Sequence, residues 1–304
     1  MWFKALRIYQ ARRPLNLTDA TLEAALTEQA FTPCHSQQEQ SAGWVAPLDG
    51  GGLAHAGPPG HWLLKLRIEE RLLPSAVIKE ALDEEVRQIE ANEGRQVGRK
   101  ERRNRMDELK ITLLPQAFTR SRYLLIWIDN NRHRVIINHG SEKWAELALN
   151  RLREGLGSLP VVPLATQLTP TQVMTQWLLD TPPAGITPLD ACELKDPDTE
   201  GAVLRCRGQN LLDDEILQHL QAGKRVTQLK LDWRDQVSFV LTEQLQLKSL
   251  SYADVLQEEA EQSNPDQDPR VALDTHFVLM SGTLGPLFDE LIDHHQGLVE
   301  LAEN

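Results

Sequence analysis

The chain has 304 residues, of which 41% are hydrophobic and 25% charged, a balance typical of a soluble globular protein with two or three domains. Lys and Arg number 32 against 44 Asp and Glu, and the resulting net charge of -12 opposes long-range attraction to nucleic acid. No apolar run approaches the ~20 residues that a membrane span needs. Because the first residues do not form a secretory signal and Cys34, Cys192 and Cys206 are too few and too distant for a disulfide framework, we expect a cytoplasmic protein with reduced thiols.

The first quarter of the chain predicts strands with a helix between them. Residues 2–9 and 61–68 have the apolar, β-branched and aromatic content of strands, and residues 43–48 are extended. Residues 18–30 predict a helix, because Thr18 or Asp19 can cap its first turn.

Residues 73–122 predict two helices inserted between strands. Apolar residues recur every three or four positions from Val77 to Ile89 and again from Met106 to Leu113, which places each set on one helix face. Pro74 suits a first helical turn, the glycines at 94–98 predict a break, and Pro115 ends the second helix because it has no amide donor.

The segments that follow predict a hairpin and a helix, and then a second, similar half. Residues 123–129 and 134–138 are strands joined through two asparagines, and residues 141–156 form an amphipathic helix. A domain boundary is expected near the proline-containing segment 155–164. The second half is expected to contain helices at 169–179, 210–222 and 286–301, strands at 202–206, 224–233, 236–242 and 271–280, a loop around Pro182, Pro183 and Pro188, and an acidic linker at 258–270.

This order of elements predicts an α+β fold with mixed or antiparallel sheets. We expect a central α+β domain of residues 1–73 and 116–165, a helical tip of residues 74–115 inserted into it, and a second α+β domain of residues 166–304.

Charge is unevenly distributed along the chain. Residues 87–134 hold twelve basic and six acidic residues, whereas residues 251–304 hold Arg270 alone against twelve acids. Arg95, Arg99 and Arg102 are expected on one helix face, where they can lie along phosphates. The alternative is an ordinary solvated face, since acidic residues are interleaved with the basic ones.

No catalytic or metal-binding constellation is apparent. The glycines at 155 and 157 imitate a dinucleotide loop, but Pro160 stands where a third glycine is required, and Gly223-Lys224 lacks the other residues of a phosphate-binding loop. His294 and His295 are adjacent and therefore diverge on a helix. We expect no enzyme activity, no cofactor and no metal.

Several words of this sequence are specific to one family. They are MWFKALRIY at the start, FTPC at 31–34, GWVAPL at 43–48, EERLLPSAVIKEAL at 69–82, LLPQAF at 113–118, GSLPVVPL at 157–164, DDEI at 213–216 and AGKRVTQLKLDW at 222–233. Together they resemble the bacterial recombination-associated RdgC family over essentially the whole chain. The resemblance implies a non-enzymatic homodimer that forms a ring with a basic hole, binds double-stranded DNA, restrains RecA and lies on the nucleoid, with the second α+β domain of residues 166–304 as the dimer base. Gly208, Gln116 and Glu142 replace basic residues that are common in that family, which predicts altered affinity.

Basic side chains without base-reading groups predict phosphate contact with little sequence preference. The 5% aromatic content disfavours a single-strand stacking platform, although Phe118 is either an exposed contact at the helical tip or packed under the hairpin. A metal-dependent DNA-processing enzyme and an acidic protein-binding scaffold are the alternative functions. The candidate DNA-binding residues are Arg95, Arg99, Lys100, Arg102, Arg103, Arg105, Arg120, Arg122, Arg205, Arg207, Gln209, Lys224 and Arg225. The last five are expected on one DNA-facing surface.

Overall fold

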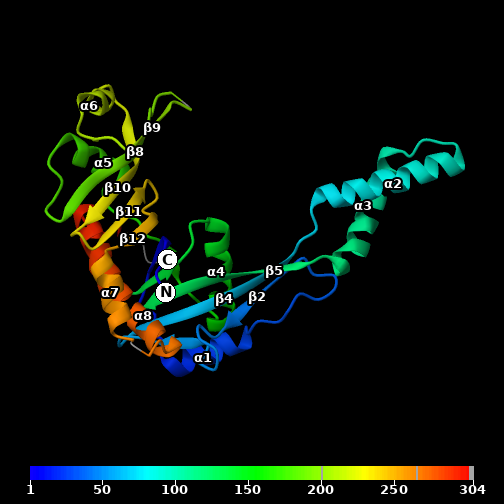
Figure 1. Cartoon of the computed structure of the whole chain (residues 1–304), viewed down its shortest axis with the longest axis horizontal. Coiled ribbons are helices and arrows are strands. Elements are labelled where there is room, and N and C mark those ends of the chain that lie inside the picture. Colours follow the sequence, from blue (N-terminus) through cyan, green and yellow to red (C-terminus); the bar gives the residue numbers. More distant parts are fainter. Residues whose placement is uncertain (200, 265, 301–304) are drawn as a thin grey trace.

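The computed structural model describes residues 1–199, 201–264 and 266–300, and these form one long sheet with helices on both faces (Figure 1). The strands are β1 (Ala5–Ala11), β2 (Gln40–Val45), β3 (Ala54–Ala56), β4 (His61–Arg71), β5 (Thr119–Asp129), β6 (Arg134–Ile137), β7 (Val161–Pro163), β8 (Ile186–Lys195), β9 (Val203–Arg207), β10 (Arg225–Trp233), β11 (Val237–Thr242) and β12 (Leu247–Tyr252). The helices are α1 (Asp19–Glu28), α2 (Ser75–Glu93), α3 (Arg99–Leu113), the 3-10 helix η1 (Leu114–Gln116), α4 (Glu142–Leu156), α5 (Pro170–Leu179), α6 (Asp214–Gln221), α7 (Asp254–Gln262) and α8 (Pro269–His294).

The sheet runs through both halves of the chain. Its strands follow the order β2-β4-β5-β6-β1-β12-β11-β10-β8-β9, with β3 beside β4 and β7 beside β1. Each of these pairings is antiparallel, so the predicted α+β class with antiparallel sheets is confirmed. β1 joins the halves, because it pairs with β6 through residues 7–10 and with β12 through Ala5 and Leu6.

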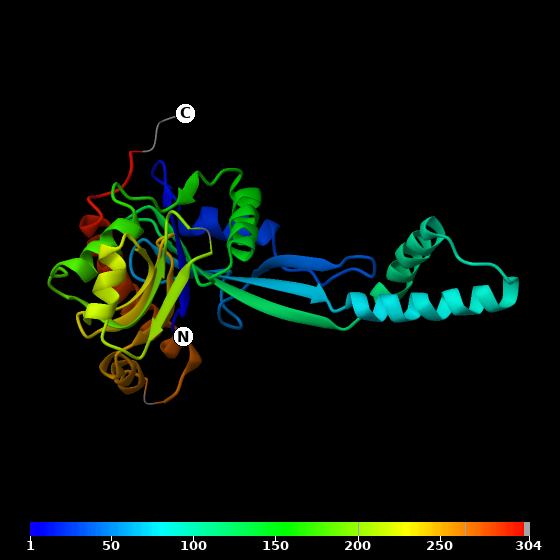
Figure 2. The same cartoon turned by 90° about the horizontal axis from the view of Figure 1, so that it is seen from above.

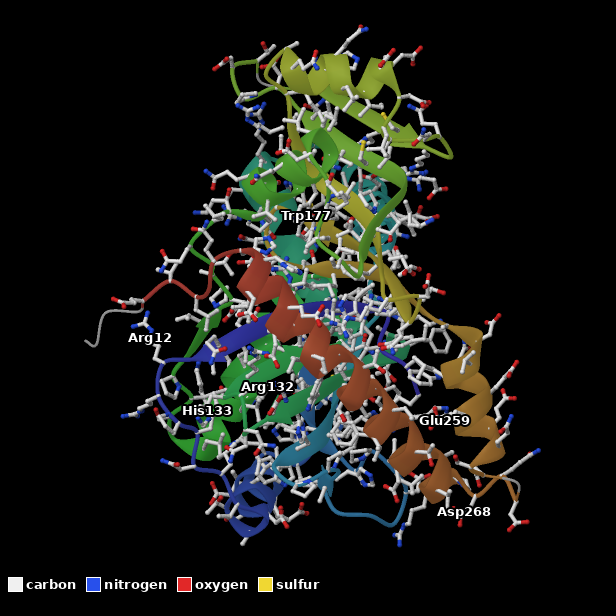
Figure 3. All side chains as sticks on the ribbon, turned by 90° about the vertical axis from the view of Figure 1, so that its left-hand side faces the viewer. Arg12, Arg132, His133, Trp177, Glu259 and Asp268 are labelled. Atoms are coloured by element: carbon white, nitrogen blue, oxygen red, sulfur yellow. The ribbon has the colours of Figure 1, made fainter. Side chains whose placement is uncertain are left out.

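The larger core lies between α8 and one face of the sheet. Phe277 and Phe288 of α8 are buried and their rings lie 6.4 and 6.0 Å from that of Trp127 in β5. The same core continues to Leu229 and Leu231 of β10, where α5 and α6 cover the sheet. Figure 3 shows α8 crossing this face, with Arg132 beside it and Trp177 of α5 near its C-terminal end.

The second core covers the opposite face in the first half only. Leu22 and Leu26 of α1 and Trp144 and Leu149 of α4 pack against even-numbered residues of β4 and β5, such as Leu64. No helix of the described chain lies over this face along β8–β12 (Figure 1). The chain therefore leaves one side of β8–β12 open to solvent.

α2 and α3 form an antiparallel arm that projects from the long β4–β5 ribbon (Figure 2). α2 ends at Gly94, which adopts a left-handed conformation at φ 65° that glycine tolerates without steric cost. The predicted pair of helices and the break between them are confirmed. The arm has a small core, since its buried hydrophobic cluster consists of Leu82, Val86 and Val97 and α3 buries no residue fully.

The root of the arm is held by a polar contact. The Arg71 guanidinium at the end of β4 donates to the carbonyl oxygens of Leu114, Pro115 and Ala117 at 3.1–3.3 Å and to that of Cys34 at 3.3 Å. Arg71 therefore caps the end of α3 and η1 and ties it to the sheet, because carbonyls at a helix end lack intrahelical partners.

Most elements predicted from local signals are confirmed. Thr18 caps α1 in a capping box, and the turn between β10 and β11 contains Arg234 and Asp235, both at φ 54° as a tight hairpin requires. α4, α5 and the β5–β6 hairpin also lie where the sequence predicts them.

The prediction for the C-terminal quarter is wrong in two places. Residues 271–280 are not a strand but part of α8, and the helix expected to begin at Pro286 already begins at Pro269. Leu273, Phe277 and Met280 are buried at helical spacing, but the apolar Val271 and Val278 are exposed on the other side, and these extra apolar residues obscure the helical periodicity of the sequence. The stretch 258–270, expected to be a linker, contains most of α7. It also contains the start of α8, where the Asp268 side chain caps the helix by accepting from the Arg270 amide at 2.7 Å. The predicted end at Leu301 lies outside the described residues.

Two strands were missed in the second half. β8 occupies the region expected to be a proline-rich loop, and Pro188 fits there because the β8–β10 register shifts between Leu229 and Leu231, opposite the proline. β12 follows a turn at Leu245 and joins the second half to β1. α8 is the one described helix long and apolar enough to cross a membrane, and half of its most apolar window is buried in the core.

Candidate nucleic-acid interface

The uncovered side of β8–β12 carries a row of polar and basic side chains, named here the open face. Successive side chains of a strand point to opposite faces of the sheet. Every second side chain therefore lies on this face, while the others fill the core under α5, α6 and α8. The strand registers assign to it Ala191, Glu193, Lys195, Val203, Arg205, Arg207, Arg225, Gln228, Lys230 and Val240.

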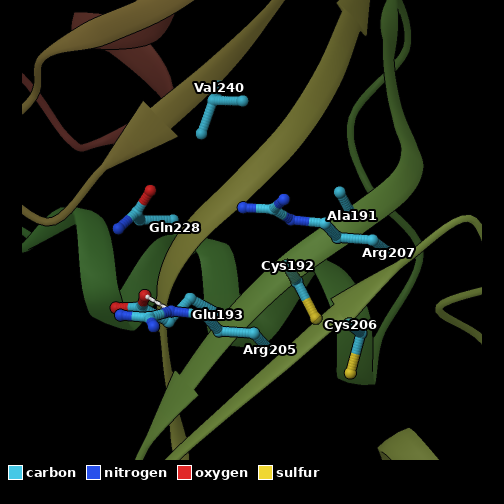
Figure 4. Close-up of a pocket in the computed structure, with 8 residues that line it drawn as sticks. All are labelled: Ala191, Cys192, Glu193, Arg205, Cys206, Arg207, Gln228 and Val240. Atoms are coloured by element: carbon cyan, nitrogen blue, oxygen red, sulfur yellow. Dashed lines mark hydrogen bonds and ion pairs between the residues drawn. The ribbon is translucent and has the colours of Figure 1, made fainter.

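A shallow cavity of about 300 Å³ lies in the open face (Figure 4). Arg205, Arg207 and Gln228 line it together with Ala191 and Val240, so charged and amide groups surround a small apolar floor. Such a surface can approach a phosphate backbone closely while its guanidinium groups donate hydrogen bonds.

Glu193 is the acidic partner within this cavity. Its carboxylate accepts from Arg205 Nε at 2.8 Å and from Thr227 Oγ1 at 3.1 Å. Burial of Glu193 opposes ionisation, but these two hydrogen bonds outweigh it and lower the pKa of Glu193 below its usual value. Glu193 is therefore charged and holds Arg205 in place. Arg207 is exposed and has no acidic partner among the described residues.

The structure separates the five residues expected on one surface. β9 and β10 both run antiparallel to β8, so Arg225 at the start of β10 lies beside the start of β9 rather than its end. Gln209 lies beyond the end of β9, where its amide donates to the Asp190 carbonyl at 3.4 Å. Lys224 lies at the opposite end, with Nζ 3.5 Å from His219 Nδ1.

The prediction of one surface requires the helix between β9 and β10 to return the chain to the same end of the sheet. β9 and β10 point in the same direction, so the connection between them must carry the chain back along the full length of the strands. Arg207 and Arg225 share the face but stand about 13 Å apart along the strands, at roughly 3.3 Å per residue.

Arg120 and Arg122 lie on the same side of the continuous sheet as the open face. They belong to the even-numbered residues of β5, which face α4 rather than α8. Both guanidinium groups bind Glu70 Oε2, at 3.3 and 3.4 Å, and Arg122 also lies 5.4 Å from the centre of the Trp144 ring. Glu70 thus keeps the two arginines side by side.

The arm holds its basic residues in two groups. Arg95 lies in the loop before α3, outside the helix, so the expected shared face with Arg99 and Arg102 is wrong. It binds Glu93 and Glu101 at 2.6 and 2.7 Å, and its hydrogen bond lowers the pKa of Glu101 to about 2.

Two further arm arginines are also engaged in ion pairs. Arg102 binds Asp83 of α2 at 2.6 Å, and Arg105 binds Glu101 at 3.3 Å. The Arg102–Asp83 pair joins the two helices of the arm, whereas the Arg105–Glu101 pair lies within α3. Of the predicted site residues in the arm, Arg99, Lys100 and Arg103 are exposed and make no ion pair within the described chain.

Phe118 is 85% exposed, so its packing under the hairpin is excluded. Its carbonyl accepts from the Leu72 amide at 2.7 Å, which places it at the root of the arm rather than at the tip. Within residues 1–199, 201–264 and 266–300, no three His, Cys, Asp or Glu side chains gather as a metal site would require. The three cysteines are free thiols.

Lys195 and Lys230 of the open face were not among the predicted site residues. Lys195 belongs to β8, which the proline-rich sequence concealed. Lys230 was detectable, because the alternation of β10 places it with Gln228 on the polar side. Its Nζ binds Asp190 at 2.8 Å.

The fold and this surface define an α+β protein with a large antiparallel sheet, a projecting helical arm and a basic face along half of the sheet. Residues 1–298 match the family model described as "Putative exonuclease, RdgC". Similar curated proteins, each named "Recombination-associated protein RdgC", come from Proteus mirabilis, 39% identical over 295 residues, and Aeromonas hydrophila, 40% identical over 294 residues. A third, from Pseudomonas aeruginosa, is 41% identical over 297 residues.

These matches cover 96% of the chain and 96–97% of each relative. The chain belongs to the RdgC family, as its sequence words indicated, and is a recombination-associated protein.

Proposed function

We propose that this protein binds double-stranded DNA without sequence preference, as a ring-shaped homodimer that restrains RecA-mediated strand exchange on the nucleoid in the cytoplasm. The observation that carries the proposal is the open face, where Arg205, Arg207 and Arg225 lie on the same side of one sheet as Arg120 and Arg122. The family name supports a role in DNA recombination.

The charge balance favours two chains around one duplex. A single chain has a net charge of -12, and acidic partners hold Arg120, Arg122 and Arg205. Two open faces brought together double the number of basic groups near a duplex, while the acidic α7 lies on the other side of the sheet with α8 (Figure 3, Glu259). Phosphate contacts then supply affinity, and no base-reading group is required.

The first experiment measures the affinity of labelled duplexes of unrelated sequence between 50 and 200 mM salt, choices set by the steep salt dependence of phosphate contacts. Similar affinities and a linear fall of log affinity with log salt support the proposal. A strong preference for one sequence contradicts it. Inhibition of RecA-mediated strand exchange at the same protein concentrations tests the recombination role.

The family description names an exonuclease, so nuclease activity needs a direct test. The same duplexes are incubated with Mg²⁺ or Mn²⁺ and examined on a denaturing gel. We expect intact DNA. Shortened strands, absent when the metal is chelated, would instead assign a metal-dependent DNA-processing activity.

The arm supplies a third test. Changing Arg99, Lys100 and Arg103 together to glutamine is expected to flatten the salt slope, by roughly 0.9 for each phosphate of B-DNA that the variant no longer neutralises. Folding should be unaffected, because these side chains are exposed and unpaired within the described chain. Arg102→Gln is the matched control, since Arg102 is engaged with Asp83 and should change the stability of the arm more than the slope. An unchanged slope in the triple variant would leave DNA contact to the open face alone.

A further inference from the structure

A second cavity, named here the junction cavity, lies where the two halves of the chain meet. β1 pairs with β12 through Ala5 and Leu6 and with β7 from Tyr9 onward, so neither strand pairs with Arg7 between them. The cavity at this interruption has a volume of about 390 Å³ and is lined by residues of α4, the β11–β12 turn and the segment that leads from β7 into α5. Sites for small molecules typically measure ~300–1,000 Å³, so the junction cavity has room for a small ligand.

Tyr9 brings a buried polar group into the junction cavity. It lines the cavity although only 2% of its surface is exposed, and its ring packs in the core beneath α4. Its hydroxyl makes no hydrogen bond within the described chain, whereas a buried tyrosine hydroxyl usually has a partner. Burial, together with the nearby charge of Glu146, raises the pKa of Tyr9 to about 12. The hydroxyl is therefore protonated and can both donate and accept a hydrogen bond.

Three carboxylates line the same cavity, and two of them have cationic partners. Glu146 lies 3.6 Å from Arg153, and Glu243 lies 3.0 Å from Lys195. Glu142 is exposed to the cavity and makes no ion pair within the described chain. It precedes Glu146 by one turn of α4, and like charges at this spacing repel each other. A cation placed beside the two carboxylates would remove that repulsion.

Arg7 is the unpaired cation of the cavity. Its Nε donates to the Gly140 carbonyl at 3.1 Å and its Nη2 to Gln244 Oε1 at 3.5 Å, and both acceptors are neutral. Arg7 makes no ion pair within the described chain, so its guanidinium has N–H donors left for an anion. Arg7 and Tyr9 stand two residues apart in β1 and therefore lie on the same face of the sheet. The cavity thus presents an unpaired guanidinium, an unpaired carboxylate and an unpartnered hydroxyl.

We propose that the junction cavity binds a small zwitterion of the α-amino acid class with an aliphatic side chain. The ammonium group of this ligand lies beside Glu142 and Glu146 and donates a hydrogen bond to the Tyr9 hydroxyl. Its carboxylate accepts from Arg7, because the guanidinium fork matches the two carboxylate oxygens.

The lining of the cavity selects this class over simple ions. A cation alone leaves Arg7 without an acidic partner, and an anion alone meets three carboxylates. A zwitterion satisfies both signs and adds no net charge. Leu164 and Leu245 are buried in the cavity wall, so an aliphatic side chain has an apolar surface to cover. The inference goes beyond the proposed function and does not depend on it, because none of the cavity residues is a proposed DNA contact.

Titration of the full chain with L-leucine, L-methionine and L-valine tests the ligand class, with binding followed by calorimetry and by ligand-observed NMR. We expect saturable binding, with L-leucine among the ligands bound. Two analogues of L-leucine are the matched controls, since isoamylamine lacks the carboxylate and 4-methylpentanoic acid lacks the ammonium group. Each analogue should bind about tenfold more weakly or worse, because each loses charge-assisted hydrogen bonds.

Tyr9→Phe tests the buried hydroxyl. It should lower the affinity for L-leucine about tenfold, because the ammonium group loses a hydrogen bond. The melting temperature should not fall, since the hydroxyl has no partner within the described chain. Tyr123→Phe is the matched control: it removes the hydroxyl of a 53% exposed tyrosine of β5 that does not line the cavity, and it should change neither quantity.

Glu142→Gln is a second test on a side chain that is exposed and unpaired within the described chain, so the variant should fold. It should weaken the binding of L-leucine but not that of 4-methylpentanoic acid, which has no ammonium group. Unchanged affinity for L-leucine in Tyr9→Phe or in Glu142→Gln would overturn the proposal, as would the absence of saturable binding of all three amino acids. Isoamylamine that binds as tightly as L-leucine would refute the role of Arg7 and, with it, the zwitterion.

Discussion

Asp289 of α8 is expected to be a principal ionic contact between the helix and the first half of the sheet. Its carboxylate accepts from Arg132 Nε and Arg134 Nη1, both at 2.7 Å, on the β5–β6 hairpin. The Arg134 side chain is only 8% exposed, and its other partner is Gln10 Oε1 at 3.3 Å. Asp289→Asn keeps the size of the side chain but removes its charge, which leaves Arg134 buried without an acidic partner.

The magnitude follows from those contacts. Breaking a fully buried ion pair costs about 3–5 kcal/mol, and a charge-assisted hydrogen bond contributes about 1.5–3 kcal/mol. Because Asp289 is 39% exposed and the amide retains one acceptor, we expect a loss of about 2–3 kcal/mol in the free energy of unfolding.

Urea denaturation followed by tryptophan fluorescence measures this loss, since Trp127 packs against α8 near the substituted position. Asp293→Asn is the control: it lies one turn further along α8, is exposed and should change stability by less than about 0.5 kcal/mol. A destabilisation of Asp289→Asn below about 0.5 kcal/mol would refute the view that this contact secures α8.

Two further outcomes are expected. Burial lowers the pKa of His61 and of His295 from the ordinary 6.5, so the fold favours their neutral forms. Below pH 6.5 the unfolded chain therefore binds more protons than the folded chain. The free energy of unfolding should decrease as the pH falls from 6.5 towards the folded-state pKa values, and urea titrations at several pH values measure this decrease. Gly43→Ala should be strongly destabilising, because the added Cβ would lie 2.4 Å from the Phe31 backbone. Gly282→Ala in α8, where the added Cβ meets open space, should be neutral or stabilising by up to about 1 kcal/mol. Equal melting temperatures for the two variants would contradict this expectation.

Local signals in the sequence were sufficient for many elements. Thr18 as a cap, the glycines at 94–98 and the turn at 234–235 each determine backbone conformation within a few residues, so α1, the arm and the β10–β11 hairpin were predictable. β8 was not, because Pro188 argues locally for a loop and only the shifted register beside β10 accommodates it.

The candidate site shows the same division. The basic character of 87–134 and of 205–225 is visible in the sequence, but whether an arginine is free depends on acids that are distant in the chain or hidden by the fold. Arg102 meets Asp83, Arg122 meets Glu70, and Arg205 meets Glu193. Spacing along a helix cannot reveal such pairs, since they form between elements.

The sequence by itself determined the α+β class, the inserted helical arm and the family, because each depends on local patterns or on words of a few residues. Only the tertiary structure decided that α8 is one buried helix, that β1 and β12 join both halves into a single sheet, and that the edge of β9 is uncovered. These features depend on which strands become neighbours across more than 200 residues of chain, as for Ala5 and Lys248. The physical reason is that strand pairing is set by long-range packing, which leaves no periodic trace in the segment itself.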